Sequence, residues 1–507
     1  MADLNPRTSR REFIKKLSIG TSAVYMSTLI NACARSADTI PNAINDEIDV
    51  DLRLTAAPDK VQILPGNATK VWRYHGELLK GPPGSLEFLS YSYLGPILHL
   101  ARGQRVRVRF NNNLPEPSII HWHGLHVPES ADGHPRLAVQ PGEEYIYEFT
   151  VMDRAGTYWF HPHPHGRTGP QVYLGLAGLI IIHDEDESAL GLPGGDQDIP
   201  IIIQDRTFDE QNQLVYSLTS MDQMMGFLGN TLLINGQTQT AKPVETRAYR
   251  LRILNGSNSR IYKLAWSDGS LITVIGTDGG LLASPSTHPF VTLAPAQRLE
   301  IWADFSGKQV GSHLQLVNQE NLTPGGGDEY TVLDFSVTKD VDSRSQLPEK
   351  LITASMNQAE KAANFSNPRD FILQMGMGMR MGMSWNINGR AFEMENVERE
   401  ETVRLGDLEV WQFTNDGGMG MTLPHPMHIH GLQFQIIDRK VDPDFLPIWE
   451  SLSGGFVDEG WHDTVLVMPG EQVRVLMRFE DFTGLYLYHC HNLEHEDMGM
   501  MRNYRII

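Results

Sequence analysis

Two strand-like phrases each occur three times along the chain. The first leads an apolar-rich stretch into an asparagine turn, and the second begins at a proline and continues into a strand-like run. Copies of the first phrase are RVRVRFNNN ending at Asn113, YRLRILNGSN ending at Asn258 and LEVWQFTNDGG ending at Gly418. Copies of the second are PGEEYIYEF from Pro141, PAQRLEIWADF from Pro295 and PGEQVRVLMRF from Pro469. Three repeats of two strand signatures, spaced far more widely than solenoid repeats, predict three similar β-domains.

Length and composition agree with this organisation. The 507 residues are 41% apolar, so the chain is long enough for several cores at roughly 150 residues per domain. Amphipathic helix patterns are scarce, whereas 46 glycines and 29 prolines punctuate short apolar runs, as is typical of Greek-key sandwiches. We therefore predict an all-β chain of three Greek-key β-sandwich domains. The predicted segments are a signal and linker over 1–40, domains over 41–187, 188–345 and 368–507, and a polar linker over 346–367.

The first 34 residues have the order of an export signal. Arg10 and Arg11 precede two lysines and a modestly apolar run, 17–32, that contains Ser, Thr, Gly and Tyr. This order resembles a twin-arginine signal, and the polar residues in the run argue against a permanent membrane span. We expect the twin-arginine machinery to export the folded protein to the periplasm or cell envelope. Two processing outcomes stay open, namely cleavage after Ala34 and acylation of Cys33 as a lipid anchor.

Charge and cysteine content exclude two classes of protein. The formal net charge is −20, and an acidic surface repels phosphates, so we expect no nucleic-acid partner. Cys33 and Cys490 are the only two cysteines. No internal disulfide network can exist after processing, which leaves Cys490 for another purpose.

The 19 histidines are unevenly distributed. The middle third holds only His288 and His313, and the outer thirds carry HWHG (His121, His123), HPHPHG (His161, His163, His165), HPMHIHG (His425, His428, His430) and HCHNLEH (His489, His491, His495). A solitary histidine is usually a satisfied polar residue, but each His-x-His pair in an extended strand directs two imidazoles to one side. HWHGL in the first domain matches HIHGL in the third, and AGTYWFHPH matches TGLYLYHCH. The outer domains therefore offer equivalent half-sites that can close around a metal cluster.

Residues at the alternate strand positions, which face away from the histidine pairs, point to a second location. Cys490 lies between His489 and His491 and must face away from them, and His425 precedes His428 by an odd number of positions. His495 and Met500 follow Cys490 closely. Two histidines, a thiolate and a distant thioether are the ligand set of a blue-copper electron-transfer site. A structural zinc site needs no axial methionine and seldom lies beside eight further histidines.

These motifs resemble the multicopper oxidase family over essentially the whole mature chain. HWHGLHVP, WFHPHPHG and HCHNLEHEDMGMM are most similar to the bacterial cuprous oxidases of copper resistance, and more distantly to spore-coat laccases and bilirubin oxidases. The resemblance implies cupredoxin-like sandwiches and four copper ions, one of type 1, one of type 2 and two of type 3. It also implies one-electron oxidation of a substrate at the type 1 copper and reduction of dioxygen to water at the other three.

Carried over position by position, the family pattern implies a complete ligand set. The type 1 ligands would be His425, Cys490, His495 and Met500. The type 2 ligands would be His121 and His428. The two type 3 ions would take His123, His161 and His491, and His163, His430 and His489. His165 has no place in this set and would lie behind the ligands.

Two acidic residues match the positions where related enzymes keep their proton-relay acids. Water formation consumes protons, so a carboxyl group near the cluster is needed. Asp132 follows the first histidine pair, and Glu496 directly follows His495. The alternative is that both are ordinary solvated charges. Cys490, adjacent to two implied type 3 ligands, would provide the electron path.

A methionine-rich segment bears on the substrate. Five methionines alternate in MGMGMRMGM, and in an extended chain they would line one edge: Met375, Met377, Met379, Met381 and Met383. Asp416, Met419 and Met421 precede the predicted ligand His425. Thioethers suit Cu(I), and the segment also resembles the methionine-rich part of cuprous oxidases, so we expect cuprous ion as the substrate.

Three alternatives stay open beside this expectation. The methionines could form an adaptable apolar flap. The enzyme could oxidise other metal ions, or it could be a laccase of phenols or other organic compounds. A copper-binding protein without turnover is disfavoured by the complete ligand set.

Overall fold

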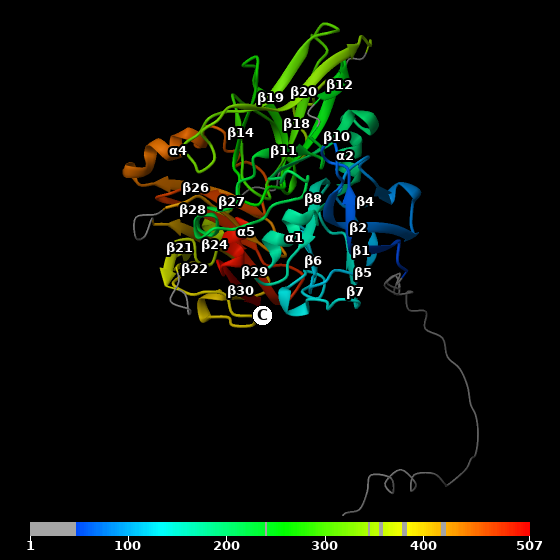
Figure 1. The fold of residues 1–507 in the computed structure, drawn as a ribbon. Coiled ribbons are helices and arrows are strands. Elements are labelled where there is room, and N and C mark those ends of the chain that lie inside the picture. Colours follow the sequence, from blue (N-terminus) through cyan, green and yellow to red (C-terminus); the bar gives the residue numbers. More distant parts are fainter. Residues whose placement is uncertain (1–46, 239–240, 343–344, 354–357, 378–382, 417–421) are drawn as a thin grey trace, which may run out of the picture. The chain divides into compact units, whose positions relative to one another are not determined.

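The computed structural model describes residues 47–238, 241–342, 345–353, 358–377, 383–416 and 422–507. Within them strands dominate and form six sheets in three pairs, so the predicted all-β class is confirmed. In Figure 1 the three pairs are coloured blue to cyan, green, and yellow to red along the chain. The export signal and Cys33 lie outside the described residues. Among those described, no helix is long and apolar enough to span a membrane.

The first domain is a sandwich of a four-stranded and a five-stranded sheet. The four-stranded sheet has the order β2 (Thr69–Lys80), β1 (Val50–Val61), β5 (Arg105–Asn112) and β7 (Glu144–Thr150). The other has the order β3 (Leu86–Glu87), β4 (Ile97–Ala101), β9 (Gly178–His183), β8 (Gly156–Pro162) and β6 (Ile120–His123). In β5 every second side chain is buried, because alternate residues of a strand face the core.

The second domain pairs a six-stranded with a five-stranded sheet. The larger has the order β11 (Thr231–Ile234), β10 (Asp198–Arg206), β13 (Ala248–Asn255), β18 (Arg298–Asp304), β15 (Ile272–Thr277) and β16 (Gly280–His288). The smaller has the order β12 (Ala241–Glu245), β20 (Tyr330–Lys339), β19 (His313–Asn318), β14 (Tyr262–Trp266) and β17 (Val291–Leu293).

The third domain has two five-stranded sheets. One has the order β22 (Met383–Ile387), β21 (Arg369–Met377), β24 (Leu408–Asn415), β28 (Glu471–Arg478) and β26 (Phe434–Val441). The other has the order β23 (Thr402–Val403), β30 (Met501–Ile506), β29 (Gly484–Cys490), β25 (His425–Ile429) and β27 (Thr464–Val467). The domain boundaries expected from the sequence stay predictions.

In the part of the chain that the structure describes, helices are short and lie between strands. The α-helices are α1 (Thr168–Leu174), α2 (Glu185–Ala189), α3 (Ser220–Met225), α4 (Leu446–Ser453) and α5 (Leu493–Asp497). The 3₁₀ turns are η1 (Pro83–Ser85), η2 (Pro135–Leu137), η3 (Gly195–Gln197), η4 (Ala359–Lys361), η5 (Arg399–Glu401) and η7 (Pro443–Phe445). The proline that opens η1, η2 and η7 suits a first helical position, where the missing N–H has no intrahelical partner.

Each domain has its own apolar core, and smaller clusters join the domains. One such cluster packs Trp159 of the first domain with Ile202 and Leu254 of the second. Another packs Ala294 of the second domain with Leu466 and Met468 of the third. Glu47–Ile507 consequently form one compact unit. This packing fixes the outer domains against each other, which a site shared between them requires.

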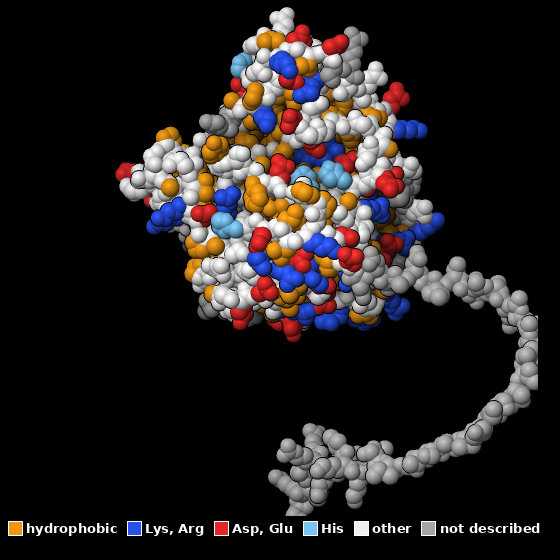
Figure 2. All heavy atoms as spheres, turned by 90° about the vertical axis from the view of Figure 1, so that its right-hand side faces the viewer, with side chains coloured by type: hydrophobic (Ala, Val, Ile, Leu, Met, Phe, Trp, Pro, Cys, Tyr) orange, Lys and Arg blue, Asp and Glu red, His pale blue; other side chains and the backbone are white. Residues whose placement is uncertain are grey.

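The surface of the first domain carries mixed charge. Acidic and basic side chains are interspersed on the face in Figure 2. The arginines of β5 are paired with acids, Arg107 with Glu148 at 2.6 Å and Arg109 with Asp51 at 3.0 Å. The acidic partners therefore neutralise the arginines of this strand, which do not form a basic surface patch.

Candidate metal centre

Four strands from the outer domains carry the histidine pairs. His121 and His123 lie on β6 beside His161 of β8, and in the third domain His428 of β25 lies opposite His489 of β29. The remaining members directly follow strands or strand ends: His163, His430 and His491. All eight are buried. Alternation along these strands turns both imidazoles of each pair toward the junction of the two domains.

The ring nitrogens of these eight histidines converge in three groups. His121 Nε2 lies 3.3 Å from His428 Nε2. His161 Nε2 lies 3.4 Å from both His123 Nδ1 and His491 Nε2. His489 Nε2 lies 3.3 Å from His163 Nε2 and 3.0 Å from His430 Nε2. Each group therefore holds two or three nitrogens that face one another.

The opposite nitrogen of six of these rings faces an oxygen acceptor. The contacts are His121 Nδ1 to Asp132 O (2.6 Å), His428 Nδ1 to Asp463 O (2.7 Å), His430 Nδ1 to Asp132 Oδ2 (2.9 Å), His123 Nε2 to Asp463 Oδ1 (2.9 Å), His161 Nδ1 to Pro162 O (2.9 Å) and His489 Nδ1 to Cys490 O (3.1 Å). A neutral imidazole has a single N–H, which these oxygens accept. In these six rings the nitrogen that faces the other histidines therefore carries a lone pair.

Burial favours the neutral form of seven of the eight imidazoles. It lowers the pKa of His121, His123 and His428 well below the usual range. It lowers the pKa of His161 to about 4 and that of His163 to about 3. Lone pairs that face one another at 3.0–3.4 Å repel unless a cation lies between them. The donor set consequently fits metal ions that prefer neutral imidazole ligands.

A second pocket lies on the other side of β29. Cys490 Sγ lies 3.5 Å from His425 Nδ1 and 3.6 Å from His495 Nδ1, and these two nitrogens are 3.3 Å apart. Burial raises the pKa of the Cys490 thiol and lowers that of His495 to about 3. Met500 is buried in the same core cluster as Cys490. Binding of a metal ion would displace the proton that burial keeps on this thiol, and this N₂S set fits copper.

Trp385 and α3 border this second pocket. The indole ring centre lies 4.8 Å from that of His425 and 4.7 Å from that of His495. The carbonyl oxygen of Met224, on α3 in the second domain, accepts hydrogen bonds from Trp385 Nε1 at 3.1 Å and from His495 Nε2 at 2.9 Å. The second domain therefore fixes the outer edge of the pocket.

The two predicted relay acids are both buried and both touch the histidine cluster. Asp132 Oδ2 accepts from His430, and burial raises the pKa of Asp132 well above its usual range. Glu496 lies 3.5 Å from His163 Nε2 and 3.2 Å from His489 Nδ1. Burial raises the pKa of Glu496, but the neighbouring His163 and His489 outweigh this and lower it to about 2. Neither acid is the solvated surface charge that the alternative interpretation required.

Helix α5 anchors this region to the other two domains. Glu494 accepts hydrogen bonds from Tyr216 Oη at 2.6 Å, from Asn258 Nδ2 at 2.9 Å and from the Phe227 amide at 2.9 Å. Asp497 accepts from the amides of Thr168 and Gly169 at 2.9 Å each. These contacts fix the segment that carries both His495 and Glu496.

The methionine-rich segment differs from the expected single extended edge. Its two described ends pair antiparallel as β21 and β22, with Met377 opposite Met383. Met375 is 5% exposed and belongs to the core of the third domain, so it does not line a surface edge. Met379, Met381, Met419 and Met421 lie outside the described residues. Asp416 is exposed at the end of β24.

Sequence reasoning missed two residues of the cluster, Asp463 and Arg298. Asp463 orients two histidines, and Arg298 of the second domain donates to both of its carboxylate oxygens, at 2.8 and 2.6 Å. His165, expected behind the ligands, is instead an exposed residue whose ring lies 5.0 Å from that of Phe392. Asp463 directly precedes the apolar strand β27. A charged residue at the start of an apolar strand was the only feature of the sequence that pointed to it.

Comparisons with known proteins agree with this geometry. Models of the family described as multicopper oxidase match residues 69–187 and 364–507. The chain is 32% identical to a multicopper oxidase, mco, of Staphylococcus haemolyticus, over 85% of this chain and 89% of that protein. It is 32% identical to a laccase of Bacillus stratosphericus, over 87% and 91% of the two chains.

A solved structure shares the fold. The structure of the McoA multicopper oxidase from Aquifex aeolicus matches 90% of this chain and 96% of that one, with a TM-score of 0.76 and 37% identity. The expected cupredoxin-like sandwich fold is therefore confirmed.

Proposed function

The chain belongs to the multicopper oxidase family, and on that premise we propose that it oxidises a reduced substrate one electron at a time and reduces dioxygen to water with four copper ions. The observation that carries this proposal is the convergence of eight buried histidines beside a separate Cys-His-His pocket. When bound, copper would supply the electron transfer and the oxygen chemistry.

We assign the ligands of each copper ion according to which ring nitrogens face one another. His121 and His428 would hold the type 2 ion. His123, His161 and His491 would hold one type 3 ion, and His163, His430 and His489 the other. His425, Cys490, His495 and Met500 would hold the type 1 ion. Cys490 lies between His489 and His491, which are assigned to the two type 3 ions. The backbone therefore joins the two pockets through a single residue.

Two acids beside the cluster would supply protons. Asp132 hydrogen bonds His430, and its pKa, raised by burial, favours the protonated form that can donate. Glu496 lies beside His163 and His489 and, as an anion, would accept a proton from solvent and pass it inward. Their positions support separate roles of donor and relay.

The Cys490→Ser substitution tests the overall function. It should abolish the blue absorption and turnover, while the copper bound by the eight histidines is retained, because the two pockets lie on opposite sides of β29. Copper per chain, the visible spectrum and oxygen uptake should be measured together. Retained blue colour would overturn the assignment, and loss of all copper would show that the pockets are not separable.

For the substrate we propose cuprous ion, bound by thioethers near the type 1 pocket. Strands β21 and β24 are parallel neighbours, with Leu373 opposite Asn415. Because the two strands are parallel, the chain continues in the same direction from both. From β21 it continues into the rest of the methionine-rich segment, and from β24 it continues toward Asp416, Met419 and Met421. Soft thioether ligands suit Cu(I). A laccase that oxidises phenols is the second candidate, since laccases are among the similar proteins.

Methionine substitution separates these candidates. Changing Met377, Met379, Met381 and Met383 to serine should lower kcat/KM for cuprous ion at least tenfold, about 1.4 kcal/mol, and leave a bulky phenol unaffected or faster. Met375→Ser, in the core, is the matched control: it should lower stability without selecting between substrates. Equal losses for both substrates would make the segment structural, and no loss for cuprous ion would favour the laccase.

We also propose export by the twin-arginine route to the periplasm or cell envelope. Arg10→Lys with Arg11→Lys should trap unprocessed protein in the cytoplasm, because the signal depends on the arginine pair. The Cys33→Ala variant separates the two processing outcomes. Release from the membrane on this change supports a lipid anchor, and a soluble product before and after it supports cleavage after Ala34.

A further inference from the structure

Asp132 and Asp463 hold equivalent positions around the histidine cluster. Each backbone carbonyl accepts from the Nδ1 atom of a histidine in its own domain, Asp132 from His121 and Asp463 from His428. Each carboxylate accepts from a histidine of the opposite outer domain, Asp132 from His430 and Asp463 from His123. Together the two aspartates orient four of the eight histidines.

Their surroundings differ in one respect. Asp132 Oδ1 has no hydrogen-bond partner among the described residues. Asp463 instead accepts two hydrogen bonds from the Arg298 guanidinium and one from Thr464 Oγ1 at 2.9 Å. Its carboxylate oxygens are thus occupied, and it is a poor candidate for a direct metal ligand although it lies within reach of His123 and His428.

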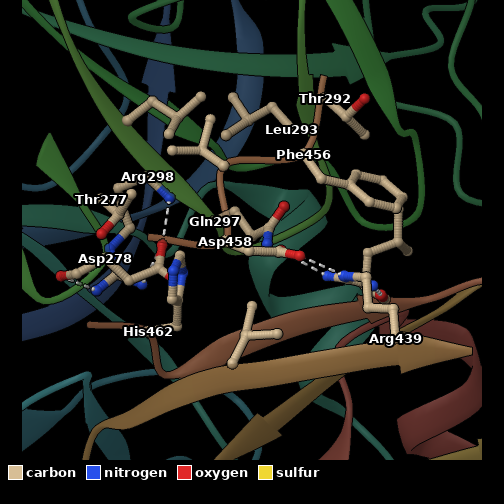
Figure 3. A pocket seen from close by; sticks show the side chains of 14 residues that line it. Thr277, Asp278, Thr292, Leu293, Gln297, Arg298, Arg439, Phe456, Asp458 and His462 are labelled. Atoms are coloured by element: carbon tan, nitrogen blue, oxygen red, sulfur yellow. Dashed lines mark hydrogen bonds and ion pairs between the residues drawn. The ribbon is translucent and has the colours of Figure 1, made fainter. Parts of the chain in front are cut away.

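Arg298 is itself held rigidly where the three domains meet. Its Nε atom donates to the carbonyl of Thr157 in the first domain at 2.9 Å, and its Nη2 atom donates to the carbonyl of Asp278 in the second domain at 2.8 Å. Figure 3 shows it on the wall of a small cavity, with Asp278 and His462 beside it and Arg439 on the opposite side. A fully buried arginine with this many fixed partners has little freedom to move.

We propose that Arg298 and Asp463 form a positioning pair through which the second domain, which supplies none of the assigned ligands, orients His123 and His428. The Asp463 carboxylate accepts the Nε2–H of His123 and leaves Nδ1 as its lone-pair nitrogen. The Asp463 carbonyl accepts the Nδ1–H of His428 and leaves Nε2 free. One residue therefore fixes opposite tautomers on two ligands. This inference rests on the proposed copper function.

Arg298→Lys tests the pair, with Arg439→Lys as the matched control. Lysine keeps the positive charge but cannot span both Asp463 oxygens, the Thr157 carbonyl and the Asp278 carbonyl. Arg439 lines the same cavity and pairs with Asp458 at 2.7 and 2.9 Å, but unlike Arg298 it donates no hydrogen bond to Asp463. Asp463→Asn serves as the second variant, because it keeps the side-chain volume and one acceptor.

The readouts are copper affinity, the type 2 electron paramagnetic resonance signal, blue absorption, and thermal unfolding of the copper-free protein. Arg298→Lys should weaken copper binding by the eight histidines at least tenfold and shift the type 2 signal, with the blue absorption retained. Asp463→Asn should do the same more weakly. Arg439→Lys should bind copper like wild type.

Two outcomes would overturn the positioning role. One is wild-type copper affinity and an unshifted type 2 signal in both Arg298→Lys and Asp463→Asn. The other is that every variant loses blue absorption and copper from the eight histidines to the same extent, in proportion to its loss of thermal stability. If wild type itself binds no copper and shows no blue absorption, the proposed function fails instead, so the two failures are distinguishable.

Discussion

Asp132 of the first domain and Asp463 of the third contact their histidines alike, but only Asp463 has an arginine against its carboxylate. Nothing opposes the rise that burial causes in the pKa of Asp132. At Asp463 burial also raises the pKa, but Arg298 opposes the rise with its charge and hydrogen bonds. A buried acid without a cation is suited to carry a proton, whereas one with a fixed cation is suited to hold a geometry.

The same contrast recurs away from the cluster. Burial raises the pKa of Glu187, but hydrogen bonds from His183 and the charges of Arg250 and Arg252 outweigh it and hold the pKa at about 2. Asp153 is buried against the His126 amide, and burial raises its pKa to about 6 despite His126 and Arg154. The free energy of unfolding should therefore depend on pH with opposite sign for acids with and without strong cationic partners. Amide substitution should lower stability for the first kind and raise it for the second.

The largest expected effect is at Asp132. Asp132→Asn should slow oxygen reduction at least about a hundredfold, the usual scale for loss of a general acid, with copper content unchanged, because an amide oxygen can still accept from His430. Steady-state oxygen uptake and stopped-flow reduction of the blue chromophore should be compared, and the latter should remain fast. Asp153→Asn is the control, because Asp153 is a buried aspartate that contacts His126 and none of the eight cluster histidines. Unchanged uptake across pH 5–8 in Asp132→Asn would make Asp132 purely structural.

A smaller effect is expected at Glu187. Its pKa of about 2 lies below the value near 4.5 of an unfolded glutamate, so its stabilisation is fully present above pH 4.5 and is lost as pH falls toward 2. Glu187→Gln should cost on the order of 3 kcal/mol at pH 7 and flatten the acid limb of the stability curve. Chemical denaturation at several pH values measures this. Glu148→Gln, which breaks the part-exposed pair with Arg107, should cost below about 1 kcal/mol.

The smallest effect is expected at Asp153, with the opposite sign. Its folded-state pKa of about 6 lies above the unfolded value, so the folded state binds the proton more tightly, and stability falls as pH rises from about 4 to 6. Asp153→Asn should remove this fall and raise stability at pH 7 by less than roughly 3 kcal/mol, the upper limit for a shift of two pKa units. Asp481→Asn, at the exposed partner of His126, should leave the slope unchanged. A steeper fall in Asp153→Asn would contradict the comparison.

Local periodicity predicted much of this molecule. The repeated strand phrases correspond to β5, β13 and β24, and to β7, β18 and β28. Side-chain alternation along β29 predicted that Cys490 would face away from His489, and the two side chains do enter different groups. Period-two reasoning succeeds here because it concerns neighbours within one strand.

Contacts between distant segments could not be predicted in this way. Arg298 and Asp463 lie on different domains, 165 positions apart, and no spacing within either motif links them. The methionine alternation predicted one extended edge, yet β21 and β22 pair with each other. Alternation is equally compatible with a single strand and with two paired strands, and the glycines between methionines permit either.

The histidines of the cluster also govern how the chain is assembled. His121 and His428, whose Nε2 atoms face each other, are separated by 307 positions. The first half-site therefore emerges from the ribosome long before the second, and neither is complete until the last sandwich has packed against the first. Shared ligands would then close a loop that contains the entire second domain, acting as a non-covalent cross-link between the two ends of the chain. Loss of the metal should loosen the docking of the outer domains before it unfolds either sandwich.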